Sequence, residues 1–163
     1  FGGVNGEKVR IQAGGGISFN GDTAAANALY DYEEGTFTPS INPGFTVSYQ
    51  TQFGRYVKIG KIIYFTLYIG TNSVSGSSNA ANAQIHGLPY NSADYSGMNG
   101  YDVSVSWIYF LGNNVNNAYV QESANYIQLL NNPTGGNREH SNANSTWDQN
   151  SLYIMCSGVY PEN

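Results

Sequence analysis

Apolar and polar residues alternate with a period of two along short segments of the chain, which is the pattern of β-strands with one face toward a core. The segments are residues 36–39, 46–49, 55–59, 61–70, 101–111, 119–122, 126–130 and 152–160. Gly60 separates two of them, and glycine tolerates the positive φ of a tight hairpin. The pattern predicts an all-β domain.

The segment 62–69 is apolar on both faces. One face carries Ile63, Phe65, Leu67 and Ile69, and the other carries Ile62, Tyr64, Thr66 and Tyr68. A strand of this kind is covered on both sides, so we expect one face to meet the core and the other to meet another sheet or a partner subunit. The candidate residues for a subunit contact are Tyr64, Thr66 and Tyr68. In the segment 101–111, the odd-numbered residues form one apolar face.

Residues 1–35 differ from the rest of the chain. They are rich in Gly and Ala, and their short apolar alternations at 9–11 and 17–19 hold too little apolar surface for a core. Asp22 and Thr23 can cap a short helical turn over 24–29. We therefore expect a stem over 1–35 that needs partner chains, followed over 36–163 by an antiparallel β-sandwich with jelly-roll-like connections. The whole is predicted to form a parallel homotrimer.

Charged residues make up only 10% of the chain, against roughly 25% in an average soluble protein. Residues 62–163 hold a single basic residue, Arg138, against six acidic ones. An acidic field repels phosphate, which argues against nucleic acid and against a strongly anionic glycan that no cation bridges. The 14 Tyr residues instead suit binding through ring stacking and hydrogen bonds.

Several absences narrow the function further. No apolar run is long enough to span a membrane, and no signal peptide is visible, so we expect no membrane insertion. Because the chain begins at Phe1 without an initiator Met, we expect a longer polypeptide upstream. Cys156 cannot form an intrachain disulfide and lies in an apolar run, which favours core packing.

Enzyme motifs are also missing from the sequence. It has no phosphate-binding Gly-rich loop, no Cys/His metal spacing and no Gly-x-Ser-x-Gly elbow, so we predict no catalytic residue, no metal and no cofactor. The acidic cluster Asp31, Glu33 and Glu34 could serve glycoside hydrolysis, metal binding or a structural ion pair in a turn, and the last is favoured. His86 precedes Gly-Leu-Pro at the end of an expected strand, where a structural role is favoured.

The segment 131–150 contains no aliphatic side chain larger than Ala, and such long loops are often functional. Trp147 could stack on a sugar ring while planar polar groups hold its hydroxyls. The alternative is a solvated loop whose Trp147 packs into the core. The segments 90–100 and 112–118 are further candidate loops. The predicted ligand-binding residues are Trp147, Asp148, Arg138, Asn137, Glu139, His140 and Tyr95.

Two consecutive stretches carry a family resemblance. GISFNGDTAAANAL (16–29), followed by DYEEGTFTP (31–39), resembles the join between the shaft and the terminal head of bacteriophage tail fibre and tailspike proteins, as in marine and cyanobacterial phages. GRYVKIG (54–60) and GLP (87–89) are similar to the early strands of the same heads. The resemblance covers about the first 90 residues, and no family binding residue is carried over.

The resemblance implies a homotrimer that follows an upstream fibre shaft at a distal position on the virion. It also implies that the protein is extracellular once the virion has been released, and that it attaches to glycans on the host surface. A receptor-binding head is therefore the leading prediction. The alternatives are a purely structural trimerisation cap and, less favoured, part of a polysaccharide depolymerase.

Overall fold

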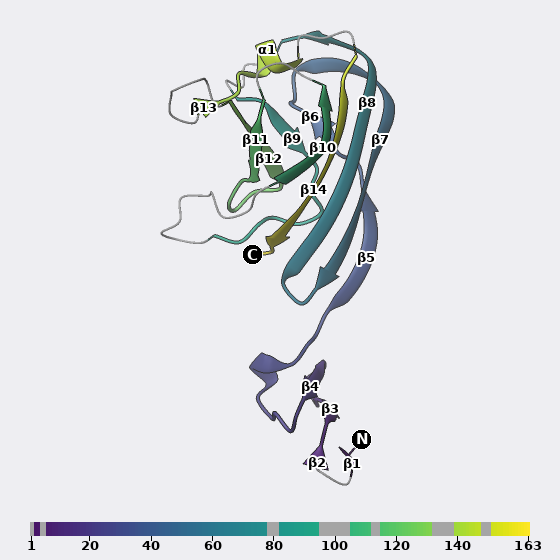
Figure 1. Cartoon of the computed structure of the whole chain (residues 1–163), viewed down its shortest axis with the longest axis vertical. Helices are drawn as coiled ribbons and strands as arrows, with labels where there is room; N and C mark the ends of the chain where they lie inside the picture. Colours follow the sequence, from purple (N-terminus) through teal and green to yellow (C-terminus); the bar gives the residue numbers. More distant parts are fainter. Residues whose placement is uncertain are drawn as a thin grey trace.

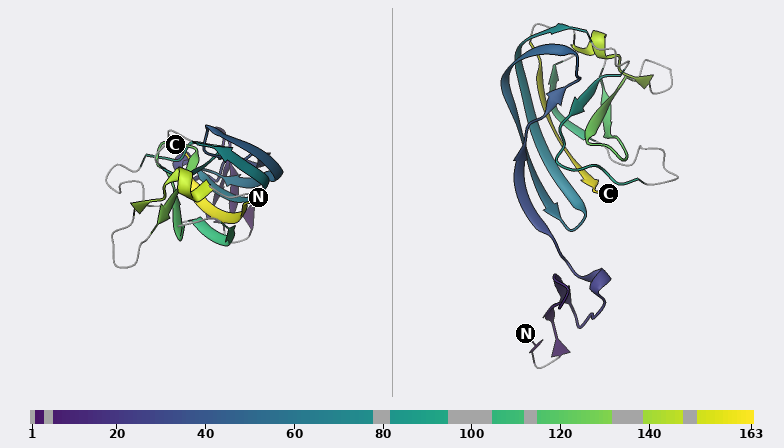
Figure 2. Two further views of the ribbon diagram at one scale, coloured as in Figure 1. Left: turned by 90° about the horizontal axis from the view of Figure 1, so that it is seen from above. Right: turned by 180° about the vertical axis from the view of Figure 1, so that it is seen from behind.

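The computed structural model describes residues 2–3, 6–77, 82–94, 105–111, 115–131, 139–147 and 151–163. These residues form an all-β protein in which every paired strand is antiparallel to its neighbour. A slender N-terminal segment lies beyond one end of two sheets, and helix α1 (Ala143–Trp147) lies at the other end (Figures 1 and 2). No helix within the described ranges has the length and apolar character of a membrane span.

The N-terminal segment, which we call the stem, consists of small local elements. Strands β1 (Gly2–Gly3) and β2 (Gly6–Glu7) pair, as do β3 (Val9–Ile11) and β4 (Ile17–Phe19), and the 3-10 helix η1 (Ala25–Asn27) follows. Helix η1 confirms the predicted helical turn in a shorter form, and the Ala24 amide that precedes it donates to Asp22 Oδ1 at 2.8 Å. Ile11 and Phe19 are 76% and 51% exposed, because the described residues of the stem form no hydrophobic cluster that could cover them.

The larger sheet has five strands in the order β10-β14-β8-β7-β5. They are β5 (Tyr32–Phe37), β7 (Phe45–Ile59), β8 (Ile62–Gly76), β10 (Val105–Leu111) and β14 (Tyr153–Pro161). Strands β7 and β8 form a long hairpin through Gly60, whose φ of 60° confirms its predicted role. The two segments expected at 46–49 and 55–59 are parts of the single strand β7.

Strand β5 begins before the predicted domain boundary at residue 36. Tyr32 already pairs with Ile59, so the sheet starts four residues earlier, and residues 32–35 are strand where a turn was expected. The ring of Tyr56 lies over Gly35, where a Cβ would be 2.5 Å from a ring carbon. The strand can continue past this ring because Gly35 has no side chain. The same arrangement recurs at Gly54, over which the ring of Phe37 lies.

The smaller sheet has the order β11-β12-β9-β6, with β13 also paired to β12. Its strands are β6 (Ser40–Ile41), β9 (Gln84–His86), β11 (Asn117–Val120), β12 (Tyr126–Asn131) and β13 (Glu139–His140). The interpretation of 131–150 as one long loop is wrong, because β13 and α1 lie within it. The short strands β6 and β13 are too brief to show periodicity, so the sequence did not predict them.

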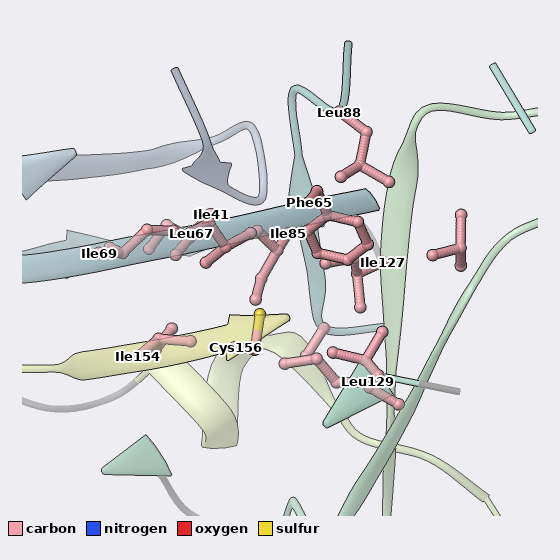
Figure 3. Packing of buried hydrophobic residues seen from close by; sticks show 14 of the residues in the cluster. Ile41, Phe65, Leu67, Ile69, Ile85, Leu88, Ile127, Leu129, Ile154 and Cys156 are labelled. Atoms are coloured by element: carbon pink, nitrogen blue, oxygen red, sulfur yellow. The ribbon is translucent and has the colours of Figure 1, made fainter. Parts of the chain in front are cut away.

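The hydrophobic core lies between the two sheets (Figure 3). From β8 of the larger sheet, Ile63, Phe65, Leu67 and Ile69 point inward, as predicted. They belong to one buried cluster with residues of the smaller sheet and of β14, which include Ile85, Ile127, Leu129, Ile154 and Cys156. The predicted core role of Cys156 is thereby confirmed, and burial raises the pKa of its thiol.

The opposite face of β8 is not covered by the second sheet of the same chain. Tyr64 is 50% exposed, Ile62 and Thr66 are exposed, and Tyr68 is half-buried. The two-faced apolar pattern of this strand therefore describes one core face and one face open to solvent, ligands or other chains. Whether a partner subunit covers it stays a prediction.

Strand β10 departs from its predicted pattern because it contains a bulge. Trp107 pairs with Cys156, but Tyr109 pairs with the next residue along, Met155, so one residue is inserted between them. The insertion reverses the facing of everything that follows. Val105 is in the core while Tyr109 is 50% exposed on the outer face, so the prediction of a single apolar face through residue 111 is wrong. Residues 101–104 lie outside the described ranges.

Candidate ligand-binding groove

Trp147 does not lie on the surface. It is fully buried in the core cluster, and its Nε1 donates to Asn42 Oδ1 at 2.6 Å. The short helix α1 turns Ala143, Thr146 and Trp147 toward the core. A ring without exposed surface offers no face to a sugar, so the prediction that Trp147 is a stacking platform is wrong, and the core-packing alternative holds.

The other predicted ligand-binding residues are placed only in part. Tyr95, Asn137, Arg138 and Asp148 lie outside the described residues, as does the side chain of Glu139. His140 is exposed: its Nδ1 is 2.9 Å from Asn82 Nδ2, and its Nε2 is 3.3 Å from the hydroxyl of Tyr119. A ligand role for these residues stays a prediction.

The three residues of the acidic cluster, Asp31, Glu33 and Glu34, each have different partners in the structure. Asp31 forms an ion pair with Lys58, whose Nζ is 2.6 Å from Asp31 Oδ2 and 2.8 Å from Glu162 Oε1. These two partners raise the pKa of Lys58 to about 12. Glu34 accepts a hydrogen bond from the Tyr32 hydroxyl on strand β5 itself. The favoured interpretation as a structural ion pair therefore holds for Asp31.

Glu33 is held by two tyrosines at the inner side of β5. The hydroxyl of Tyr56 donates to Oε1 and that of Tyr90 donates to Oε2 at 2.6 Å, and the two donors lower the pKa of Glu33. The Tyr90 ring in turn lies 4.7 Å from Lys58 Nζ. In the part of the chain that is described, no group of three or more His, Cys, Asp or Glu is arranged to hold a metal ion.

His86 has the structural role that was favoured for it. Its Nε2 lies 3.0 Å from Gln84 Oε1, and its ring packs against that of Tyr126, with the ring centroids 5.2 Å apart. It ends strand β9 and is half-buried, which lowers its pKa. The His86 ring is therefore already engaged by neighbours within the smaller sheet.

A groove of about 910 Å³ crosses the larger sheet on the face turned away from the core. Its floor follows one register row through all five strands, because the cross-strand pairs join Ser106 to Ser157, Ser157 to Thr66, Thr66 to Arg55, and Arg55 to Thr36. Neighbouring strands are about 4.8 Å apart, so the row is about 19 Å long. Four of its five side chains are short hydroxyl-bearing ones.

Bulkier side chains lie on both sides of this row. On one side, the next register row carries Val159, Tyr64 and Val57, which line the groove together with Glu34 at its β5 end. On the other side, the next row carries Tyr109, Met155, Tyr68 and Phe53. The row of small residues thus lies between two rows of larger side chains and runs across the strands of the sheet, whose order Figure 1 shows.

The chemistry of the groove is mostly uncharged. Thr and Ser hydroxyls both donate and accept hydrogen bonds, and the half-exposed ring of Tyr64 provides a flat apolar surface beside them. Arg55 is exposed, and its guanidinium lies 5.4 Å from the centre of the Phe53 ring. With Arg55 and Glu34 as its charged lining residues, the groove suits an extended, hydroxyl-rich ligand.

The comparisons with known proteins give no further guide, because no family model, no curated protein and no solved structure matches the chain.

Proposed function

We propose that the chain is the receptor-binding head of a trimeric bacteriophage tail fibre or tailspike, carried on the virion, and that it attaches to host surface glycan through the groove of the larger sheet. The observation that carries the proposal is the row of hydroxyl-bearing residues in the groove, beside the half-exposed ring of Tyr64. Sugars have hydroxyls around a ring with apolar C–H faces, so they need this combination of groups. The family resemblance of residues 16–29 and 31–39 supports the placement on a fibre.

The exposed apolar surface of the stem supports the proposal of a trimer. Its apolar side chains are exposed in the single chain, among them Ile11, Phe19, Leu29 and Tyr30. Burial of such surface is favourable, and three stems packed around a common axis would bury it. The stem and the groove lie on different parts of the chain, so subunits can meet at the stem while the groove stays open to a ligand. This arrangement competes with the predicted subunit contact through Tyr64, Thr66 and Tyr68.

We also propose that the two sheets form an antiparallel β-sandwich with jelly-roll-like connections. Residues of both sheets contribute to a single hydrophobic cluster, which is the basis of a sandwich. The chain passes repeatedly between the sheets: β5, β7, β8, β10 and β14 belong to one, and β6, β9, β11 and β12 to the other. Such repeated crossing is typical of jelly rolls.

A non-enzymatic role fits the acidic residues that could have served catalysis. Asp31 is paired with Lys58, and both oxygens of Glu33 accept hydrogen bonds from tyrosines. A structural trimerisation cap is the second candidate, because the exposed apolar stem requires partner chains whatever the head binds.

An immobilised panel of host surface polysaccharides tests the proposal with Tyr64→Ala and a matched surface control, Thr46→Ala, at the far end of β7. Loss of a stacking ring costs about 1–3 kcal/mol, which is roughly a five- to 150-fold loss of affinity per site. The control should bind like the parent. Binding to no polysaccharide would favour the structural cap, and release of oligosaccharides would favour a depolymerase. Sedimentation of the parent as a stable monomer would refute the trimer.

A further inference from the structure

Arg55 occupies a singular position in the groove. It lies in the floor row between Thr36 and Thr66, where the other side chains are short and neutral. The side chain is exposed, and within the described ranges no carboxylate lies within 4.0 Å of it. Its contact is with the ring of Phe53, 5.4 Å from the guanidinium carbon, which limits the directions in which the side chain extends.

A guanidinium is a planar group whose parallel N–H donors match the two oxygens of a carboxylate. An arginine that has no acidic partner and is steadied by an aromatic ring has those donors free for a ligand. A sugar carboxylate would therefore bind more strongly at this position than a sugar hydroxyl, whose single oxygen cannot match both parallel N–H donors.

The surroundings of Arg55 restrict how much negative charge the ligand can carry. Glu34 lines the same groove on the neighbouring strand β5, and the net charge of the chain is -5. A second carboxylate close to the first would face Glu34 and the acidic field of the domain without another cation in the groove lining. The geometry fits a ligand with one carboxylate flanked by neutral sugars and disfavours a polyanion.

We infer that the groove takes a linear polysaccharide laid across the strands, with the carboxylate of one uronic-acid residue at Arg55 and a neutral sugar beside it over Thr66, against the ring of Tyr64. The neutral part of the chain continues past Ser157 and Ser106. This inference rests on the proposed function of the groove and adds the chemical class of the ligand, its direction across the sheet and the position of its single charge.

The test compares each ligand with its own neutral form. Gellan, hyaluronan and alginate oligosaccharides are immobilised beside their carboxyl-reduced derivatives, in which each carboxylate has become a hydroxymethyl group. The whole chain, Arg55→Gln, Arg55→Lys and the control Lys61→Gln are applied at low and moderate salt. Lys61 is an exposed basic residue at the β7–β8 turn, outside the groove lining.

The parent should prefer an acidic ligand with spaced carboxylates over its reduced form by about tenfold, the worth of one charge-assisted contact. Alginate, a polyuronate, should bind more weakly than gellan. Arg55→Gln should bind the acidic and reduced forms alike, Arg55→Lys should retain part of the preference, and Lys61→Gln should retain all of it. Moderate salt should reduce the preference without abolishing binding to the reduced form.

The outcomes separate the inference from the proposed function. If the parent binds acidic and reduced forms equally, the inference is overturned while the glycan groove stands. If no acidic probe binds but neutral polysaccharides do, the same conclusion follows. If neither kind binds, both fail. If Arg55→Gln converts trimers to monomers in sedimentation, the groove is a subunit contact and the ligand assignment is overturned.

Discussion

Truncation of the buried tryptophan gives the most direct test of how α1 is attached to the domain. Trp147 is fully enclosed and joined to Asn42 by a hydrogen bond of 2.6 Å. Replacing a buried Trp by Ala costs about 3–5 kcal/mol, and the lost hydrogen bond adds about 1 kcal/mol. Since a domain of this size is stable by about 5–15 kcal/mol, Trp147→Ala should bring it near the limit of folding.

The loss of stability in Trp147→Ala is limited because Asn42 keeps its other hydrogen bonds. Its Oδ1 still accepts from the Gln84 amide at 2.7 Å, and its Nδ2 still donates to the Asn82 carbonyl at 2.9 Å. Trp147→Phe keeps most of the ring volume and removes the indole N–H, so it should cost about 1–3 kcal/mol. The difference between the two variants separates packing from hydrogen bonding.

Urea unfolding followed by circular dichroism measures these effects. One fixed protein concentration is used, because the proposed trimer would make the stability depend on concentration. The expected order of midpoints is parent, Trp147→Phe, then Trp147→Ala. The reasoning would be refuted if Trp147→Ala unfolded at the parental midpoint and lost binding to host glycan. That result would place the ring on the surface as a ligand contact.

Other substitutions test particular contacts. Gly54→Ala should lower the unfolding free energy by about 1–3 kcal/mol, because a Cβ would lie 2.4 Å from the ring of Phe37; a midpoint equal to that of the parent would contradict this close contact. Thr146→Val should leave the urea midpoint unchanged or raise it, since the buried Thr146 hydroxyl has no hydrogen-bond partner within the described residues; a clear loss of stability would reveal one. The folded-state pKa of Glu33 is lowered, so its stabilising effect is present above the unfolded pKa of about 4.3 and is lost as the pH falls through the folded value. Thermal midpoints of Glu33→Gln between neutral and acid pH should therefore fall less steeply than those of the parent, and parallel curves would exclude this role. Cys156 should react with a thiol reagent only after denaturant is added, because burial raises the pKa of its thiol, and rapid labelling of the folded chain would show that the core is open.

The long strands of the larger sheet could be predicted because their burial follows directly from local alternation. In β8, every second residue from Ile63 to Ile69 is in the core, as the pattern indicates. The fate of the opposite face could not be predicted, since an apolar outer row is compatible with a second sheet, a subunit or a ligand.

Two errors have a common physical origin in tertiary contacts that local patterns do not contain. The bulge between Trp107 and Tyr109 changes the facing of β10 through its pairing with β14, about 50 residues away in the chain. Trp147 stands among polar residues, and only its distant partner Asn42 and the core reveal that α1 covers the end of the domain.

The groove was missed for a related reason. Its floor residues are single small polar side chains on separate strands, and none stands out in its own segment. Only the register between the strands aligns Thr36, Arg55, Thr66, Ser106 and Ser157. The outward-facing polar positions of β8 and β14 were a partial signal, but they acquire meaning only when the strand order is known.

The position of β14 has a consequence for biosynthesis. This strand lies between β10 and β8, so the larger sheet is in two separate parts until residues 153–161 have been translated. A ribosome that stalls before this point leaves a chain with two unpaired strand edges and an open core, a state prone to aggregation and proteolysis. The larger sheet can therefore close only after β14 has been synthesised, which makes its completion a late step in the folding of a nascent chain.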